Sequence, residues 1–217
     1  MTRAAVQPIS TDLWEVMRTA TTVRRYRDEP VDDDVLERCL QAATWAPSGG
    51  NQQPWRFVVL RSEQARDVVT KAAQQTWKTM ADFYGFTIPP DDAVDTKSRV
   101  LRAMWEHMHV GGNAPECVLF CVQPQAGASE LQNGGSIFPA VQNFLLAARA
   151  QGLGAAITLW HDQCATELRA LIGIPDDWVI ATLLTVGWPQ GGHRPVRRKA
   201  LSELAVVDRW DRFWGTA

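Results

Sequence analysis

Residues 42–59 read AATWAPSGGNQQPWRFVV, a stretch in which a helical pattern ends, a sharp loop follows and an apolar strand begins. Pro47, Gly49 and Gly50 are strong turn signals, so we expect the preceding helix to stop at this loop. The two glycines allow the backbone to approach a ligand closely, and the amides of residues 51–53 add neutral hydrogen-bond donors and acceptors. A plain helix-to-strand turn would use the same residues, so the loop alone leaves both interpretations open.

The residues upstream of this loop predict two helices joined by a basic connector. A short helix is expected from Asp12 to Thr19, and residues 32–34 form an acidic start for a second helix. The connector from Thr21 to Arg27 places hydroxyls beside guanidinium groups, which suits a phosphate, although a solvated basic segment would look the same. Apolar residues at helical spacing define the second helix: Val35, Leu36, Cys39, Leu40 and Ala43.

Downstream, apolar runs and turn residues predict the remaining elements. Strands are expected at 57–60, 117–122, 155–160 and 179–186. Helices are expected at 63–80, 96–109, 136–150 and 167–172, with glycines at 111–112 ending one of them and a polar loop at 123–135. A helix-rich chain with about four strands and no clear linker indicates one α+β domain over residues 1–217, with helices layered on a central sheet.

The composition is that of an ordinary globular protein and excludes several classes of partner. The net charge of −2 predicts neither nucleic acid nor an anionic membrane as partner. No window approaches the ~18 apolar residues of a membrane span, and residues 1–10 do not resemble a signal peptide, so a cytoplasmic protein is the default expectation. The four cysteines are expected to be small core residues: Cys39, Cys117, Cys121 and Cys164.

Most side-chain chemistries find no support in the sequence. It contains no nucleophile motif of the G-x-S-x-G kind, no Walker loop and no G-x-G-x-x-G after a strand. His107 and His109 would point to different faces of a helix, so no metal site is expected. The basic run at 193–199 is most simply a solvated face. Three features remain: the basic connector that could bind a phosphate, the Gly-Gly-Asn loop and the ten tryptophans. Together they favour an enzyme whose chemistry is carried by a cofactor.

Three segments together resemble the FMN-dependent nitroreductase family over most of the chain, from Leu13 to Leu201. The most specific segment runs from Val23 through the glycine loop to Val59. The second is AVQNFLLAA at 140–148 with Gly-Leu-Gly at 152–154, and the third is LLTVGWP at 183–189 followed by a basic pair at 197–198. The resemblance implies a nitroreductase-like three-layer α/β/α sandwich with a mostly antiparallel sheet. It also implies an intertwined homodimer whose interface includes the helix at 136–150.

The resemblance further implies an activity. An FMN-dependent oxidoreductase of this type takes hydride from NADH or NADPH at flavin N5 and passes electrons to an electron-poor acceptor in a ping-pong cycle. The acceptor would be a small aromatic molecule, such as a nitroaromatic, or a quinone. No side chain need be catalytic, because the flavin carries the chemistry. Two alternatives stay open: a flavoprotein with another reaction, such as dehalogenation, flavin fragmentation or deazaflavin-linked reduction, and a non-redox flavin-binding or storage protein.

The resemblance assigns five residues to the flavin phosphate and ribityl chain: Thr22, Arg24, Arg25, Arg197 and Arg198. One position departs from the family, which usually has an arginine three residues before Arg24, where this chain has Thr21. One charge-assisted contact is therefore missing, an effect on the order of 1.5–3 kcal/mol if nothing replaces it.

Eight further residues are assigned to the flavin ring and its surroundings: Pro47, Ser48, Gly49, Asn51, Gln53, Thr158, Leu159 and Trp160. The first three would lie along the flavin, partly from the other subunit, and Thr158 would lie near N5. Residues 77–112 carry no family signature, and we expect them to form a substrate lid because variable loops on a rigid scaffold often set specificity. The residues expected to line the substrate are Phe83, Tyr84, Trp105 and His109.

Overall fold

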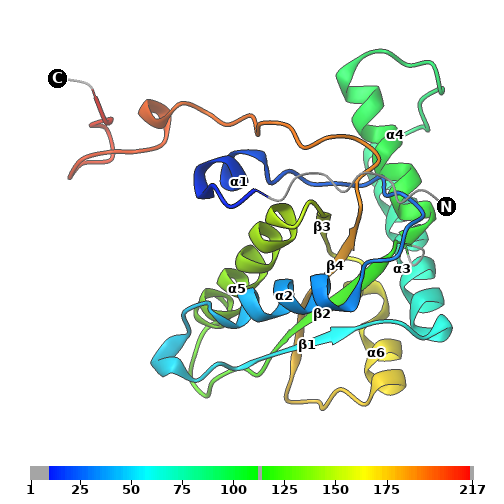
Figure 1. Ribbon diagram of the computed structural model, residues 1–217, viewed down its shortest axis with the longest axis horizontal. Coiled ribbons are helices and arrows are strands. Elements are labelled where there is room, and N and C mark those ends of the chain that lie inside the picture. Colours follow the sequence, from blue (N-terminus) through cyan, green and yellow to red (C-terminus); the bar gives the residue numbers. More distant parts are fainter. Residues whose placement is uncertain (1–9, 112–113, 216–217) are drawn as a thin grey trace.

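Four strands form one antiparallel sheet in the order β1-β2-β4-β3 (Figure 1). The strands are β1 (Trp55–Val59), β2 (Glu116–Val122), β3 (Gly154–Thr158) and β4 (Val179–Gly187). The computed structural model describes residues 10–111 and 114–215. Residues 112–113, expected at a helix end, and residues 1–9, examined for a signal peptide, lie outside the described residues. Since β2 and β4 are central, β1 and β3 are the edge strands of the sheet.

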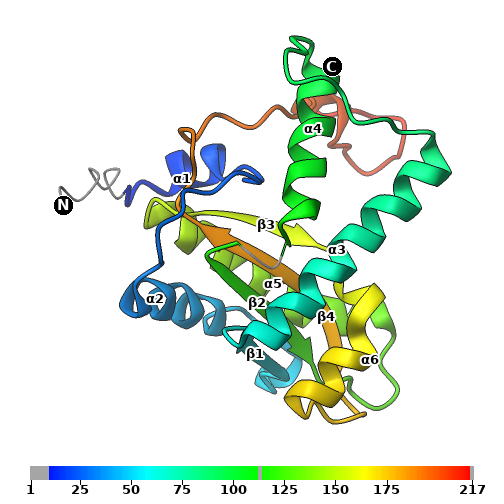
Figure 2. The ribbon, with the colours of Figure 1, turned by 90° about the vertical axis from the view of Figure 1, so that its right-hand side faces the viewer.

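Helices cover both faces of this sheet and give it two hydrophobic cores. Alternate side chains of β2 point to opposite faces, as the strand period of two requires. Val118 and Phe120 pack in one core with α2 (Asp33–Thr44) and α5 (Glu130–Ala150). Cys117 and Leu119 pack in the other core with α3 (Glu63–Tyr84) and α6 (His161–Ile172). Figure 2 shows α3 and α6 in front of the sheet, with α5 behind it. The structure thus confirms the expected α+β fold with a layered central sheet.

The cysteines contribute to these cores as expected. All four are free and buried, and burial raises the pKa of each thiol, to about 12 for Cys39 and Cys117 and about 11 for Cys121 and Cys164. They are therefore protonated packing residues in the described structure.

Two helices form a hairpin that rises beyond the sheet. The first half of α3 is buried against the sheet through residues such as Val69 and Ala73, whereas none of its residues from Thr76 onward is buried. α4 (Thr96–His109) packs beside α3, and the two project together past the strands (Figures 1 and 2). The lid expected over residues 77–112 therefore falls mainly on this helical hairpin.

The structure confirms most expected elements and corrects two helix starts. All four strands are present within two residues of their predicted ends, and α4 has the predicted bounds. The expected loop at 123–135 and the helix start at Ser136 were wrong, because α5 begins at Glu130 with a capping box between Ser129 and Gln132. The predicted start of α6 at Glu167 was also wrong. This helix begins six residues earlier, at His161, where Trp160 gives no side-chain cap to mark it.

Candidate functional site

The outer edge of β3 is covered at one end by the segment that follows α1 (Leu13–Thr19). Thr22 forms a parallel bridge with Ala155, and the Val23 amide donates to the Ala155 carbonyl at 3.0 Å. A Cβ on Gly154 would lie 2.4 Å from Cγ2 of Val23, so only glycine allows this approach. The contact fixes Thr22 and Arg24 beside β3, while Ile157 further along the strand remains 48% exposed.

A cavity of about 380 Å³ opens at the end of β3, between the strand end and the α3–α4 hairpin. We call it the ring-end cavity. One wall is the strand end itself, and the opposite wall is made largely of methionines. Unbranched thioethers form an adaptable apolar surface that suits aromatic rings. Its lining residues are Arg24, Thr76, Met80, Met104, His107, Met108, Ile157, Thr158, Leu159, Trp160, Asp162 and Gln163.

Arg24 lines this cavity and has no ion-pair partner among the described residues. It is half-buried, its pKa is lowered chiefly by burial, and within residues 10–111 and 114–215 it makes no hydrogen bond or ion pair. Arg25, its neighbour, is exposed and donates from Nε to Oε2 of Glu106 at 2.5 Å. A half-buried guanidinium without a counterion is available to bind an anionic or electron-rich ligand.

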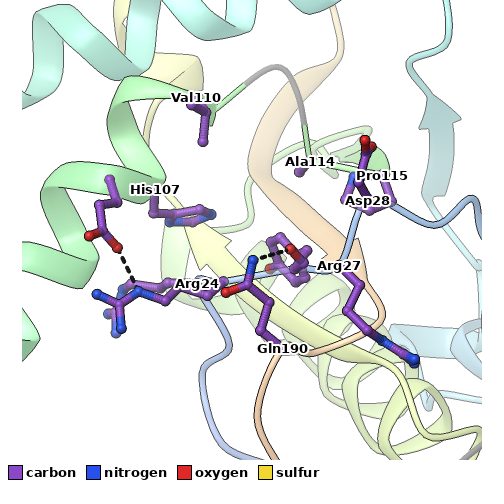
Figure 3. A pocket seen from close by; sticks show the side chains of 11 residues that line it. Arg24, Arg27, Asp28, His107, Val110, Ala114, Pro115 and Gln190 are labelled. Atoms are coloured by element: carbon purple, nitrogen blue, oxygen red, sulfur yellow. Dashed lines mark hydrogen bonds and ion pairs between the residues drawn. The ribbon is translucent and has the colours of Figure 1, made fainter.

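Arg24 also lines a second cavity of about 410 Å³ between its own segment and the end of α4, shown in Figure 3. His107 lines both cavities and is held by a buried polar network. Its Nε2 lies 2.8 Å from Oγ1 of Thr185, which lies 2.9 Å from the Tyr26 hydroxyl. Burial, with the nearby Arg24 charge, lowers the pKa of His107 to about 4, so the ring is neutral at pH 7. His107 also packs against Trp160, with ring centroids 4.7 Å apart.

A third cavity of about 190 Å³ lies on the other side of Ile157, which lines both it and the ring-end cavity. We call it the phosphate-end cavity. Its lining combines hydroxyls, amide and basic groups and includes no carboxylate. Such a set of donors suits a phosphate group. The polar residues that line it are Thr21, Thr22, Gln142, Arg149, His193 and Arg198.

The glycine loop lies elsewhere in the chain's own fold. Pro47, Ser48 and Gly49 line a separate cavity of about 470 Å³ beside the start of α5. The Gly49 amide donates to Oγ of Ser136 at 3.3 Å, and the Gln53 amide donates to Oγ of Ser48 at 2.9 Å. These bonds anchor the loop to the first half of α5.

The predicted flavin residues therefore fall into two groups at opposite ends of α5. Ser136 contacts the glycine loop, and Arg149, 13 residues further on, lines the phosphate-end cavity. At the rise of an α-helix, 13 residues span roughly 20 Å. The groove around β3 and the glycine loop are thus separated within one chain.

The structure places the other predicted residues as follows. Thr158 lines the ring-end cavity, but its hydroxyl is buried and donates to the Leu183 carbonyl at 3.0 Å. Arg197 is exposed and lines none of the cavities described above. Asn51 and Gln53 are exposed at positive φ. These backbone angles fit a loop whose shape depends on local hydrogen bonds.

The predicted substrate residues lie away from the ring-end cavity in this structure. Phe83 and Tyr84 are exposed at the end of α3. Trp105 and His109 stack on each other and line a small cavity of about 170 Å³ on another face of the hairpin. Sequence reasoning missed the three methionines and Arg149. The signal available was the 3.6-residue period, which sets Met104 and Met108 on the same face of α4.

Comparison with known proteins shows the family to which the chain belongs. Residues 17–188 match the Nitroreductase family, so the chain belongs to that family of flavoenzymes and is an oxidoreductase by that membership. Over 182 residues it is 30% identical to 5,6-dimethylbenzimidazole synthase of Rhodospirillum rubrum, covering 79% of each protein.

Two solved structures share the fold and contain FMN. One is a Desulfovibrio desulfuricans protein in complex with FMN, with a TM-score of 0.65, 27% identity and coverage of 93% of this chain and 99% of that one. The other is oxidised iodotyrosine deiodinase bound to FMN and 3-iodo-L-tyrosine, with a TM-score of 0.67, 25% identity and coverage of 93% and 100%. The reactions named for these relatives differ, so the family alone does not define the substrate.

No helix in residues 10–111 and 114–215 is long and apolar enough to cross a membrane. Within the same ranges, no group of three or more histidine, cysteine or acidic side chains is arranged to hold a metal ion.

Proposed function

We propose that this protein is an FMN-dependent oxidoreductase that uses NADH or NADPH to reduce a small electron-poor aromatic or quinone-like acceptor. The donor set along β3 fits FMN, because a cationic cavity without carboxylates adjoins a mostly apolar cavity of about 380 Å³ whose charged lining residues are Arg24 and Asp162. When bound, FMN supplies the redox chemistry, accepting hydride from the nicotinamide and returning electrons to the acceptor.

The single observation that carries this proposal is Arg24. It is a half-buried arginine with no partner among the described residues, and it lies in the segment joining the two cavities along β3. A fixed positive charge at this point would bind the ribityl phosphate chain or stabilise negative charge on the pyrimidine side of the ring. Leaving such a charge unpaired costs stability, which is consistent with a group preorganised for a ligand.

The remaining residues around the ring-end cavity orient ligands and exclude water. Trp160 is buried behind the strand end, and neutral His107 packs on it without adding a second charge beside Arg24. The methionine wall would hold donor and acceptor in turn, as a ping-pong reaction requires. We propose that the α3–α4 hairpin at 77–112 is the substrate lid, since it supplies this wall.

We further propose that the complete site is formed in a homodimer. The glycine loop lies roughly 20 Å along α5 from the phosphate-end cavity within one chain. Two copies paired about a twofold axis, with their α5 helices antiparallel, would bring the glycine loop of one copy to the flavin groove of the other. Pro47, Ser48, Gly49, Asn51 and Gln53 would then contact the flavin across the interface.

Exposed apolar side chains support this pairing. Phe138 on α5 is 49% exposed and Trp14 on α1 is 78% exposed. The C-terminal segment after β4 runs away from the domain in Figure 1 and carries Trp210, which is 90% exposed, and Trp214. Large apolar groups left exposed in one chain mark surfaces that are covered in an assembly.

The first experiment is a visible spectrum of the purified protein, with FMN added if it is colourless. We expect flavin absorption that bleaches anaerobically with NADH or NADPH. Failure to bind flavin at high added FMN would contradict the proposal. Sedimentation should give twice the chain mass, and a monomer with full flavin affinity would contradict the two-chain site.

A second reaction is favoured by one observation, the likeness to iodotyrosine deiodinase bound to 3-iodo-L-tyrosine. Reductive dehalogenation of an aromatic ring would use the same cavity and the same flavin. A screen of nitroaromatics, quinones and halogenated phenols with the reduced protein separates the two reactions, because only dehalogenation releases halide.

A further inference from the structure

We infer that Arg149, together with His193, replaces the arginine that the family has at position 21 and anchors the flavin phosphate. This inference rests on the proposed function, because it assigns residues to the phosphate of bound FMN. Arg149 lies on α5, far in sequence from Thr22, Arg24 and Arg198, which the family resemblance assigns to the phosphate and ribityl chain.

Arg149 is fixed at the wall of the phosphate-end cavity. Its side chain is 11% exposed, and its Nε donates to Oγ1 of Thr19 at 2.8 Å. Oε1 of Glu15 lies 3.8 Å from its Nη2, but Glu15 also pairs with Arg18 at 2.5 Å. Glu15 does not line the cavity. The guanidinium is therefore held in place through α1 while its carboxylate partner is shared and lies outside the cavity.

His193 provides a second, independent sign of a ligand. Its Nδ1 is buried and has no hydrogen-bond partner among the described residues, while Nε2 lies 3.4 Å from the Gly152 carbonyl. Because Nε2 faces a carbonyl, Nδ1 donates to a phosphate oxygen only when the ring is protonated. A bound phosphate would favour that imidazolium form and would also give the buried nitrogen a partner. Both His193 and Arg149 line the same small cavity as Thr21.

The cavity's chemistry favours a phosphomonoester. Arg149 and Arg198 supply two positive charges, and Thr21 and Thr22 supply hydroxyls. No carboxylate lines the cavity to compete for these donors. The short side chain of Thr21 leaves room for the guanidinium of Arg149, which extends into the cavity from α5 and not from the connector at 21–27.

The test compares FMN with riboflavin, which lacks the phosphate. Quenching of flavin fluorescence by the apoprotein gives both dissociation constants. We expect Arg149→Gln to weaken FMN binding about 10- to 100-fold and to change riboflavin binding less than twofold. The matched control is Arg18→Gln, which removes the other partner of Glu15 without touching the cavity. It should leave both constants unchanged.

Two further variants extend the test, and the first keeps the inference testable even if Arg149→Gln folds poorly. His193→Gln should weaken FMN binding three- to tenfold without affecting riboflavin. Adding Thr21→Arg to Arg149→Gln restores the family's arginine and should recover most of the lost FMN affinity. Loss of both flavins together in Arg149→Gln, or no rescue by Thr21→Arg, would overturn the inference.

The other outcomes separate the inference from the function it rests on. If the unmodified protein binds neither flavin, the proposed function and the inference both fall. If it binds FMN and Arg149→Gln binds FMN equally well, only the inference falls. A phosphomonoester is also present on NADPH. If Arg149→Gln changes the ratio of NADPH to NADH rates but not FMN affinity, the cavity serves the nicotinamide and the inference is wrong.

Discussion

The phosphate-end and ring-end cavities lie on either side of Ile157 but are lined by different kinds of side chain. The phosphate end is lined by charged and hydroxyl groups held by specific bonds, such as that between Arg149 and Thr19. The ring end is walled by three methionines from a hairpin that projects beyond the sheet. Directional bonds select one group, whereas flexible thioethers accommodate many shapes.

The two cavities also differ in the hydrogen bonding of the histidine ring that lines each of them. At the ring end, Nε2 of His107 lies 2.8 Å from a hydroxyl oxygen of the protein itself. At the phosphate end, His193 keeps a buried nitrogen without a partner in the described residues. If FMN binds as proposed, its phosphate would complete the unpartnered nitrogen of His193, whereas the ring of His107 would keep its protein partner as ligands exchange. Changes at the phosphate end should therefore alter flavin affinity, and changes at the ring end should alter acceptor choice.

The largest effect is expected at Arg24, which lies in the segment joining the two ends. Arg24→Gln removes the unpaired charge and should weaken FMN binding by about 2–3 kcal/mol, or roughly 30- to 150-fold. The control is Arg25→Gln, which removes a neighbouring exposed guanidinium already bonded to Glu106. Fluorescence titration should show at most a threefold change for the control. Equal losses in the two variants would mean that net charge, not the position of Arg24, determines flavin binding.

A substitution at Gly154 tests whether the two ends share one support. The added Cβ of Gly154→Ala would lie 2.4 Å from Val23, so the segment carrying Thr22 and Arg24 must shift. Overpacking of this kind costs about 1–3 kcal/mol, which denaturant unfolding would measure, and FMN affinity should fall with it. Gly191→Ala is the control, because nothing lies within 4 Å of its added Cβ. A Gly154→Ala protein with unchanged stability and FMN affinity would show that the contact does not position the segment.

The two ends also differ in how far the sequence predicts them. The family resemblance predicts Thr22, Arg24 and Arg198, since basic segments in loops could by themselves be solvated faces, and these three residues do line cavities along β3. Arg149 was missed since a basic residue in the last turn of a helix is ordinary helix chemistry. Only the three-dimensional packing of α1 against α5 shows that it faces a cavity.

The same limit explains what was missed at the ring end. The positions of the strands could be predicted from apolar runs such as 117–122, and α4 could be predicted from its helical pattern. Which face of α4 meets the cavity depends on how the hairpin sits over β3, a long-range contact that helical periodicity cannot report. Aromatic content suggested Trp105 and His109, whereas the cavity is walled by Met104 and Met108. The start of α5 was missed because glycines at 134–135 concealed a capping box five residues upstream.

Acid should weaken the ring end through His107. Its pKa is about 4 in the folded protein and 6.5 in the unfolded chain. The folded state therefore resists a proton that the unfolded state accepts between these values, so stability is complete above pH 6.5 and is lost as pH falls towards 4. Between pH 7 and pH 5 this group should cost about 1–2 kcal/mol. Denaturant unfolding of His107→Asn should show a shallower loss over that interval. The control is His109→Gln, an exposed histidine on the same helix, and equal slopes for all three proteins would rule out this origin.

The smallest effect separates two adjacent residues of α4. Met104 lines the ring-end cavity, and Trp105 lines the small cavity on another face of the hairpin. Met104→Ala should change the ratio of kcat/KM between a one-ring and a two-ring quinone about fivefold, near 1 kcal/mol, because the wall recedes. FMN affinity should stay within twofold, since no phosphate contact is touched. Trp105→Ala should leave the ratio unchanged if the acceptor binds against the methionine wall. The reverse result, with Trp105→Ala shifting acceptor preference and Met104→Ala silent, would place the acceptor on the aromatic face that the sequence suggested.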